Sequence, residues 1–407
     1  MRAGQTIARL AAFTGRGPGT DAERRAALWL AAQLREAGSE PTIETFWCRP
    51  NWGLAHAWHV ALALTGSLLA VSHGRVGLAL VLLALASILF DTWRGVSLGR
   101  WLTPQRASQN VVARADAATS TSSPGARPVT TADRTTRLII TANYDAGRTA
   151  AIYGRTARAL RAVLRRATGG RAPGWLAWLV LVLVWIAITA ALRINGTSAH
   201  TVGLLAVIPS AALVLALALL LEAAAAAPGP AAGDNGSGTA VAVALFTALQ
   251  TSPPRHLDVA LVLCGAHEGG AIGLRRHLRG RRARLANTIV VGVAACGAGE
   301  PRWWESDGPL LPRRTANALR AVAGELAARY PELGLRPHRG RGWSPAYATR
   351  RRPAITLGAL DADSLIPHSH RPDDLPPTID TRVPDTVLEV GLLFVDALDA
   401  RLGHPGR

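Results

Sequence analysis

The sequence of 407 residues contains no lysine, so each of its 45 basic side chains is an arginine. Only 27 acidic residues oppose them, and the formal net charge is +18. Such a charge is typical of nucleic-acid-binding proteins, but neither an aromatic and basic platform nor a recognition-helix motif accompanies it. Because alanine, glycine and proline are also abundant, the arginine bias indicates a GC-rich coding sequence. We therefore expect no nucleic-acid partner.

Cysteine is scarce as well, with Cys48, Cys264 and Cys296 as the only three. Their spacing fits neither a cysteine metal cluster nor an even-numbered disulfide framework. Cys264 and Cys296 end apolar runs and are expected to be buried. A cleavable signal peptide is also missing, because residues 1–50 lack a short basic head followed by an apolar stretch. The N-terminus is therefore expected to stay on the side where it is made.

Long apolar runs, in contrast, are present at about residues 54–72, 76–90, 174–192 and 202–227. Roughly 20 apolar residues cross a hydrocarbon core as a helix, so the first, third and fourth runs are long enough. The second is short, but only three residues separate it from the first, which predicts a helical hairpin, and Trp93 and Trp101 follow as interfacial anchors. Helices buried in a globular core are the alternative, which such uninterrupted runs favour less.

The distribution of arginine predicts an orientation for the two hairpins, 54–92 and 174–227. The hairpin loops carry one arginine each, Arg75 and Arg193, whereas the flanking segments carry many. Because cytoplasmic loops of membrane proteins are enriched in basic residues, we expect both hairpin tips outside and the other segments in the cytoplasm. The sequence thus predicts a multi-pass protein of the cell membrane, with membrane lipid as a partner.

The remaining segments, 1–53, 93–173 and 228–407, have the pattern of one discontinuous α/β domain. Short apolar runs predict strands at 42–46, 110–113, 137–142, 257–264, 288–293 and 354–357. Helices are expected at 237–249, 271–278, 315–330 and 384–402, and an opening helix after a cap at Thr20 or Asp21. This alternation predicts a mostly parallel sheet that helices cover on both faces.

Two short motifs stand at the ends of expected strands or before expected helices. They are Gly233-Asp234-Asn235-Gly236-Ser237-Gly238 and Cys264-Gly265-Ala266-His267-Glu268-Gly269-Gly270. Together with Gln109-Asn110-Val111-Val112-Ala113 and the opening helix, they occur in an order that resembles the zinc-dependent aminopeptidase family often called M-twenty-eight, whose relatives include glutaminyl cyclases. The resemblance covers nearly all segments outside the hairpins. It implies two zinc ions, a bridging carboxylate and a glutamate base that activates a shared water.

Carried over position by position, the resemblance implies half of such a site. Three zinc ligands remain, at Asp234, Glu268 and His370. Two ligand positions that belong to the other ion are occupied by Asn143 and Ala294. An amide is a poor zinc ligand and an alanine is none, so we expect one zinc ion at most. Two carboxylates, one imidazole and a water would complete an open four-coordinate site.

The resemblance also assigns supporting and catalytic positions. Asp145 and Asp374 stand where carboxylates orient histidine ligands, although at Asp145 that histidine is missing. His267 stands where the family has its glutamate base. Imidazole has a suitable ordinary pKa of about 6.5, but once protonated it is repelled by a nearby dication, whereas a protonated carboxylate is neutral.

The sequence therefore predicts a membrane-anchored peptidase homologue with a degenerate metal site, catalytically impaired or inactive. The alternative is a one-zinc hydrolase that acts on peptide N-termini with His267 as its base. The hydrolase is expected to act on peptide or protein N-termini, whereas a silent domain is expected to bind peptide or to serve as a membrane-anchored interaction surface. Transport is a weaker hypothesis, because the apolar runs carry no charges in their middle. Each single residue also has an ordinary explanation, such as Asp234 in a turn or His370 on a surface loop.

Overall fold

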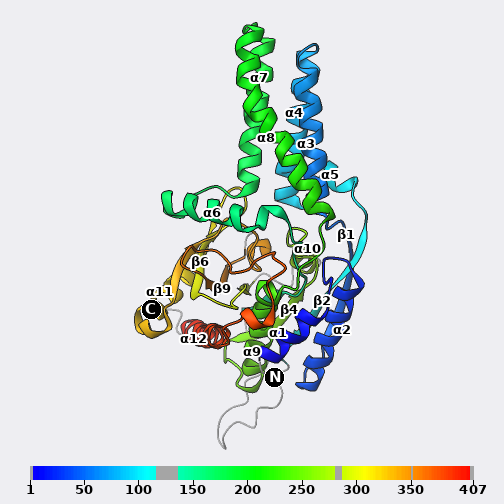
Figure 1. The fold of residues 1–407 in the computed structure, drawn as a ribbon. Coiled ribbons are helices and arrows are strands. Elements are labelled where there is room, and N and C mark those ends of the chain that lie inside the picture. The colour runs from blue at the N-terminus through cyan, green and yellow to red at the C-terminus, as the bar shows by residue number, and fades with distance from the viewer. Residues whose placement is uncertain (1–2, 116–135, 280–286, 350–351, 404–407) are drawn as a thin grey trace, which may run out of the picture.

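The computed structural model describes residues 3–115, 136–279, 287–349 and 352–403. Figure 1 shows an α/β body from which a bundle of long helices projects, and α6 (Arg155–Ala167) lies at the junction of the two. The bundle comprises α3 (Trp52–Leu69), α4 (Gly74–Arg94), α7 (Trp175–Ile194) and α8 (Ala199–Ala225). These helices interrupt the chain of the body twice, so the body is assembled from segments far apart in the sequence.

Nine strands of the described residues form one sheet in the body. Their order is β1-β2-β4-β3-β5-β9-β6-β7, and β8 pairs with β6 outside this path. The bounds are β1 (Thr42–Cys48), β2 (Arg106–Arg114), β3 (Thr136–Asn143), β4 (Leu257–Cys264), β5 (Thr288–Val293), β6 (Glu300–Asp307), β7 (Arg313–Arg314), β8 (Arg336–Arg339) and β9 (Ala354–Leu360). All six predicted strands are present. The other three were not predicted, because β6 to β8 carry charged residues rather than apolar runs.

The sheet is mixed, so the prediction of a mostly parallel sheet is wrong. The central strands β4, β3, β5 and β9 run parallel to one another. On either side, β1 with β2, β2 with β4, β6 with β9 and β6 with β7 pair antiparallel. Parallel neighbours need a long crossover, usually a helix. Only residues 294–299 connect β5 to β6, so the chain turns back and β6 runs in the opposite direction.

Helices cover both faces of the sheet. Ile140 of β3 packs into a core with α2 (Asp21–Glu36), α9 (Gly238–Thr251), α11 (Asn317–Arg329) and α12 (Arg382–Gly403). Its neighbour Ile139 faces the other side, where α10 (Ile272–Arg279) packs, as the two-residue period of a strand requires. The predicted cap is confirmed, because the Thr20 side chain accepts a hydrogen bond from the Glu23 amide at the start of α2. Cys264 and Cys296 are buried as expected.

Three helices of the described residues are long and apolar enough to cross a membrane: Gly74–Arg94, Trp175–Ile194 and His200–Ala225. The prediction of two complete spanning hairpins is therefore wrong for α3, although α3 packs along α4 and α8. His56 and His59 make its first half too polar. Both are buried against α4, where His59 Nε2 lies 2.9 Å from Ser87 Oγ and His56 Nε2 lies 3.8 Å from Asp91 Oδ2.

The bundle has an apolar core and an apolar exterior. Its interior contains residues such as Val60, Val81, Leu183 and Leu213 from all four helices. Large apolar side chains also point away from the protein, on α4 (Leu82, Leu83, Leu89, Phe90), α7 (Leu181, Val184, Ile188) and α8 (Leu204, Val207, Ile208, Val214, Leu215). Exposed apolar surface of this extent marks contact with a partner or a membrane.

Candidate active site

The predicted site residues gather at the carboxyl ends of the central parallel strands, where open α/β sheets bind ligands. Asn143 is the last residue of β3, and Ala294 follows β5. His267 and Glu268 follow β4, and Asp234 lies in the turn η3 (Ala232–Ser237) before α9. His370 comes from the loop after β9. All six side chains or backbones line one cavity, so the structure brings the predicted ligand and base positions together.

His370 faces both surviving carboxylates. Its Nε2 lies 3.3 Å from Glu268 Oε2 and 3.9 Å from Asp234 Oδ2, while its Nδ1 lies 3.1 Å from the carbonyl oxygen of Arg148. A carbonyl only accepts, so we assign the proton of the neutral ring to Nδ1. The Nε2 lone pair then faces two carboxylates, an arrangement that calls for a cation or a further proton between them.

The imidazole of His370 is held on both sides. Tyr153, in the short helix η2 (Ala151–Tyr153), stacks on it with a centroid distance of 4.1 Å and an angle of 16°. On the chain before it, Gly147 leaves the room for the ring, because a Cβ there would lie 2.1 Å from His370 Cε1. Ser369 donates its hydroxyl to Asp234 Oδ2 at 2.5 Å. The ring and the carboxylate are thus positioned by neighbours that no sequence motif indicated.

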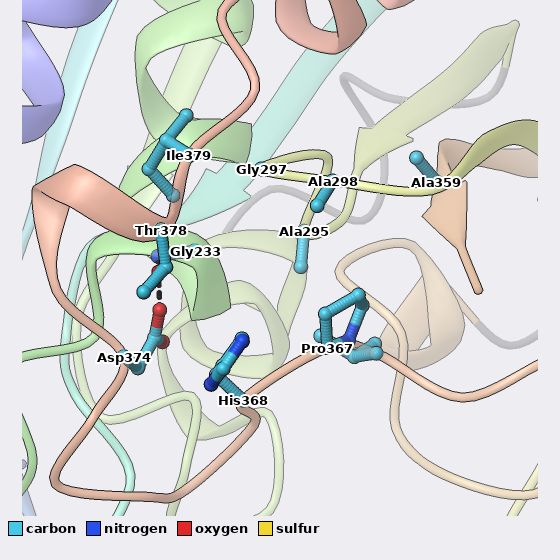
Figure 2. A pocket seen from close by; sticks show the side chains of 11 residues that line it. Gly233, Ala295, Gly297, Ala298, Ala359, Pro367, His368, Asp374, Thr378 and Ile379 are labelled. Atoms are coloured by element: carbon cyan, nitrogen blue, oxygen red, sulfur yellow. Dashed lines mark hydrogen bonds between the residues drawn. The ribbon is translucent and has the colours of Figure 1, made fainter.

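Asp374 supports the turn of Asp234 rather than the ring of His370. Its Oδ1 accepts the Gly233 amide at 2.7 Å and its Oδ2 accepts the Asp234 amide at 2.9 Å. Figure 2 shows Asp374 pointing at Gly233 beside a small cavity of about 10 Å³, which His368 also lines. His368 Nδ1 lies 3.3 Å from Asp373 Oδ2, outside the group around His370. Burial raises the pKa of Asp374 to about 6.

Asp145 has a corresponding role for Glu268. It is fully buried, and its Oδ2 accepts the Glu268 amide at 2.9 Å. Burial raises the pKa of the Asp145 carboxyl. The Glu268 pKa is also raised, well above its ordinary value, by burial first and then by the charges of Asp234 and Asp145. Several carboxylates therefore share a site in which positive charge is needed.

Asp234, Glu268 and His370 are residue types that bind zinc, but the three side chains are not all at the distances that a shared ion requires. Ligands of a tetrahedral zinc ion, each about 2 Å from the metal, lie about 3.3 Å from one another. The distance from His370 to Glu268 agrees with this value, whereas Asp234 is farther away. Among the residues that the structure describes, no group of three or more His, Cys, Asp or Glu side chains is arranged to hold an ion.

Asn143, one of the two altered ligand positions, pairs with the neighbouring amide of Asn235. Asn235 Nδ2 donates to Asn143 Oδ1 at 2.9 Å and to the Val293 carbonyl at 3.1 Å. Both amides are buried, and Ala294 adds no polar side-chain atom. This connection between the ends of β3 and β5 is neutral and contributes no anionic side chain.

His267 is buried, and its ring is engaged on one side. Its Nε2 lies 2.9 Å from the carbonyl oxygen of Trp343, so Nε2 carries the proton of the neutral ring. Its Nδ1 is buried and makes no hydrogen bond in the described part of the chain. Any proton that His267 accepts must therefore go to Nδ1.

The site opens into a cavity of about 740 Å³. One end contains the residues around His370. The other end is lined by α6 and by the ends of the bundle helices, with Trp52, Leu160, Trp175 and Trp178. Arg161 on α6 lies over the ring of Tyr153, at 5.6 Å from its centroid. The segment that leads into the second pair of long helices thus forms one wall of the site.

No family model matches the sequence, and no curated protein does. Solved structures do match. They include a zinc aminopeptidase from Bacillus subtilis, at 13% identity and a TM-score of 0.54, covering 98% of this chain and 94% of that chain. A glutaminyl cyclase from Porphyromonas gingivalis matches at 14% identity and a TM-score of 0.52, covering 97% and 96%. The LapA aminopeptidase of Legionella pneumophila matches at 11% identity and a TM-score of 0.51, covering 98% and 71%. The chain therefore has the fold of these aminopeptidases and of this glutaminyl cyclase.

Proposed function

We propose that the protein is a membrane-anchored aminopeptidase-like protein that binds the amino-terminal end of a peptide at a one-zinc site and hydrolyses it slowly or not at all. One observation carries the proposal: His370 Nε2 faces Glu268 and Asp234 while its Nδ1 is fixed on the Arg148 carbonyl. Asp234, Glu268 and His370 are the residues that would hold the ion. When bound, zinc supplies a Lewis acid there.

The peptide N-terminus is the ligand that this charge pattern suits. Asp234 and Glu268 line the same cavity as Arg158, Arg161 and Arg165 of α6, so acidic and basic side chains both face it. An α-ammonium group is attracted to the carboxylates, and the cavity of about 740 Å³ has room for several residues. The fold shared with zinc aminopeptidases supports the same ligand class.

The replaced base limits the chemistry. A general base must come within hydrogen-bond reach of the water that it deprotonates. His267 offers only Nδ1, because Nε2 is engaged with Trp343, and its protonated form carries charge where a protonated glutamate carries none. We therefore propose impaired or absent turnover.

A one-zinc hydrolase with His267 as base is the second candidate. The observation in its favour is that the buried Nδ1 makes no hydrogen bond within the described residues although His267 lines the cavity. In this candidate, Nδ1 is the ring atom that would take the proton from the attacking water.

We also propose that the long helices anchor the protein in the cell membrane, with the α/β body in the cytoplasm. The outward apolar side chains of α4, α7 and α8 support insertion, and the arginines of the flanking segments support the orientation. Because the cavity reaches the ends of these helices, a peptide approaches the site along the membrane surface.

Binding and turnover are tested on zinc-loaded protein in lipid nanodiscs. A short peptide with a free N-terminus is expected to bind at least tenfold more tightly than its N-acetylated form, with release of its first residue at or near the background rate. Equal affinity for the two peptides would contradict the proposal that the site recognises a free peptide N-terminus. Rapid release that His267→Ala abolishes would favour the one-zinc hydrolase instead.

A further inference from the structure

A second cavity, of about 200 Å³, lies between the end of α4, the short helix α5 (Leu98–Trp101) and α10. Figure 1 shows α5 beside the foot of the projecting helices. Among the residues that the structure describes, those lining this cavity include six arginines and no acidic residue; the arginines are Arg49, Arg94, Arg100, Arg275, Arg276 and Arg279. We call this the arginine cavity.

The positive charge of the arginine cavity is only partly neutralised. Arg100 pairs with Asp91, with 2.5 Å between Nε and Oδ1. Arg49 donates to the main-chain carbonyl of Trp101 at 3.0 Å, and Arg276 to that of Trp47 at 3.1 Å. Arg94 lies over the ring of Trp93 at 4.3 Å. Carbonyls and rings orient these guanidinium groups without cancelling their charge, so an anion in the cavity is favoured.

A simpler role accounts for some of the arginines. Arg275 Nη2 donates to the Thr92 carbonyl at 3.3 Å, and Arg279 donates to the Arg94 carbonyl. Both contacts satisfy the last carbonyls of α4, where basic side chains stabilise a helix end. Arg49 contacts α5 and Arg276 contacts β1 instead, so neither takes part in capping α4. Their charges therefore need another explanation.

The rim of the arginine cavity is aromatic and exposed. Trp47 and Trp101 line it and are 62% and 65% exposed. From its edge, the exposed apolar residues Leu82, Leu89 and Phe90 extend along the outside of α4. In membrane proteins, tryptophan is enriched at the lipid headgroups, basic residues contact anionic headgroups, and apolar helix faces contact the acyl chains. The arginine cavity, its tryptophan rim and the apolar face of α4 therefore match these three environments.

We propose that the arginine cavity binds the phosphate of an anionic lipid headgroup, with the acyl chains of that lipid lying along α4. The inference rests on the proposed insertion of the bundle in a membrane, and does not depend on the peptide site. Arg49 and Arg276 contact the phosphate, and Trp47 and Trp101 pack against the glycerol region. A bound lipid of this class would set the orientation of the α/β body relative to the membrane surface.

The test uses the full chain in nanodiscs of phosphatidylcholine with a minor fraction of phosphatidylglycerol, analysed by native mass spectrometry. Wild-type protein is expected to retain phosphatidylglycerol at least tenfold more than the double variant Arg49→Gln/Arg276→Gln. The matched control, Arg75→Gln/Arg193→Gln, removes the same charge at the far ends of the long helices and is expected to retain the lipid. Equal retention by wild type and the Arg49/Arg276 variant would overturn the proposal.

A second arm separates lipid from free phosphate and from misfolding. Inorganic phosphate added to phosphatidylcholine nanodiscs is expected to bind far more weakly than the lipid; equal binding would make the cavity a site for a free anion and contradict the proposal. If the double variant has an altered circular dichroism spectrum, Trp101→Ala tests the rim without changing charge, and undiminished lipid retention by this variant would also contradict it. Membrane insertion is scored separately, by resistance to alkaline extraction.

Discussion

His370 and Glu268 face each other across the candidate site, with 3.3 Å between Nε2 and Oε2, while the Nδ1 of His370 lies 3.1 Å from the Arg148 carbonyl oxygen. This relationship is the reason to expect a cation at the site. Its components come from the loop after β9 and from the end of β4, so small displacements of either change the site.

Gly147→Ala is expected to disrupt the position of His370. A Cβ at residue 147 would lie 2.1 Å from His370 Cε1, so the ring must move away from Glu268. Zinc affinity, measured by competition with a chelating dye, should fall about 10- to 100-fold, the size of effect seen when metal ligands lose their support. Gly324→Ala in α11 is the control, because no atom lies within 4 Å of its added Cβ. Unchanged affinity in Gly147→Ala would show that His370 does not hold the metal.

Tyr153 tests whether the segment before α6 supports the site. Its ring stacks on His370 at 4.1 Å. Tyr153→Ala removes the stacking surface and is expected to lower zinc affinity roughly tenfold, whereas Tyr153→Phe keeps the ring and should bind zinc as the wild type does. If both variants behave alike, the stacked ring does not position His370.

A glutamate at position 267 tests the proposed effect of the replaced base. His267→Glu is expected to raise the release of N-terminal residues from a peptide by at least about tenfold, since a general base is worth roughly 10²–10⁴-fold. His267→Ala should leave the low rate of the wild type unchanged. A rate that His267→Glu does not increase would show that the lost base is not the limiting change.

Glu23 predicts a pH dependence of stability outside the metal site. Its carboxylate is buried and accepts the amides of Gly19 and Ala266, and its pKa is raised to about 8, chiefly by burial. The pKa in the unfolded chain is about 4.3. Below both values the group is protonated in both states. Between them only the unfolded chain loses the proton, so stability falls as pH rises from about 4.3 to 8 and then levels off.

The measurement is the unfolding of wild type and Glu23→Gln in detergent at several pH values. The wild type is expected to lose stability relative to the variant across this window, by an amount on the order of a few kcal/mol at most. Parallel curves for the two proteins would contradict the assignment of Glu23.

The orientation in the membrane is tested with single cysteines. Ser72, between α3 and α4, and Ser252, after α9, are both exposed, whereas the three native cysteines are buried. In intact cells an impermeant maleimide is expected to label Ser72→Cys and to leave Ser252→Cys unlabelled until lysis. The reverse pattern would place the body outside the cell.

Much of the fold was predictable, because it follows from local patterns. The short apolar run of β3, whose residues Ile139 and Ile140 lie on opposite faces of the sheet, needed no partner to be recognised. β6 escaped prediction, because Glu300–Asp307 carries charged and aromatic residues that no apolar run marks. In α3 the length of the apolar run predicts a membrane span, but His56 and His59 make its first half polar.

The site was predictable only where a motif marks the residue. Asp234 and Glu268 lie within short motifs at strand and helix ends, and a resemblance assigns their roles. Tyr153 lies in no motif, and its contact with His370 arises when distant loops dock. Likewise, no local pattern reveals that Arg148 supplies a carbonyl to His370 or that Trp343 engages His267. Such contacts depend on tertiary packing across more than 70 residues of chain.

The most direct test of the account is the zinc content of the purified full-length protein in nanodiscs, measured by inductively coupled plasma mass spectrometry after dialysis. The account predicts close to one zinc ion per chain, lost in Asp234→Ala and in His370→Ala, and retained in Asp373→Ala, whose carboxylate lies beside His368 instead. Protein that binds no zinc, or that keeps its zinc in both Asp234→Ala and His370→Ala, would contradict it.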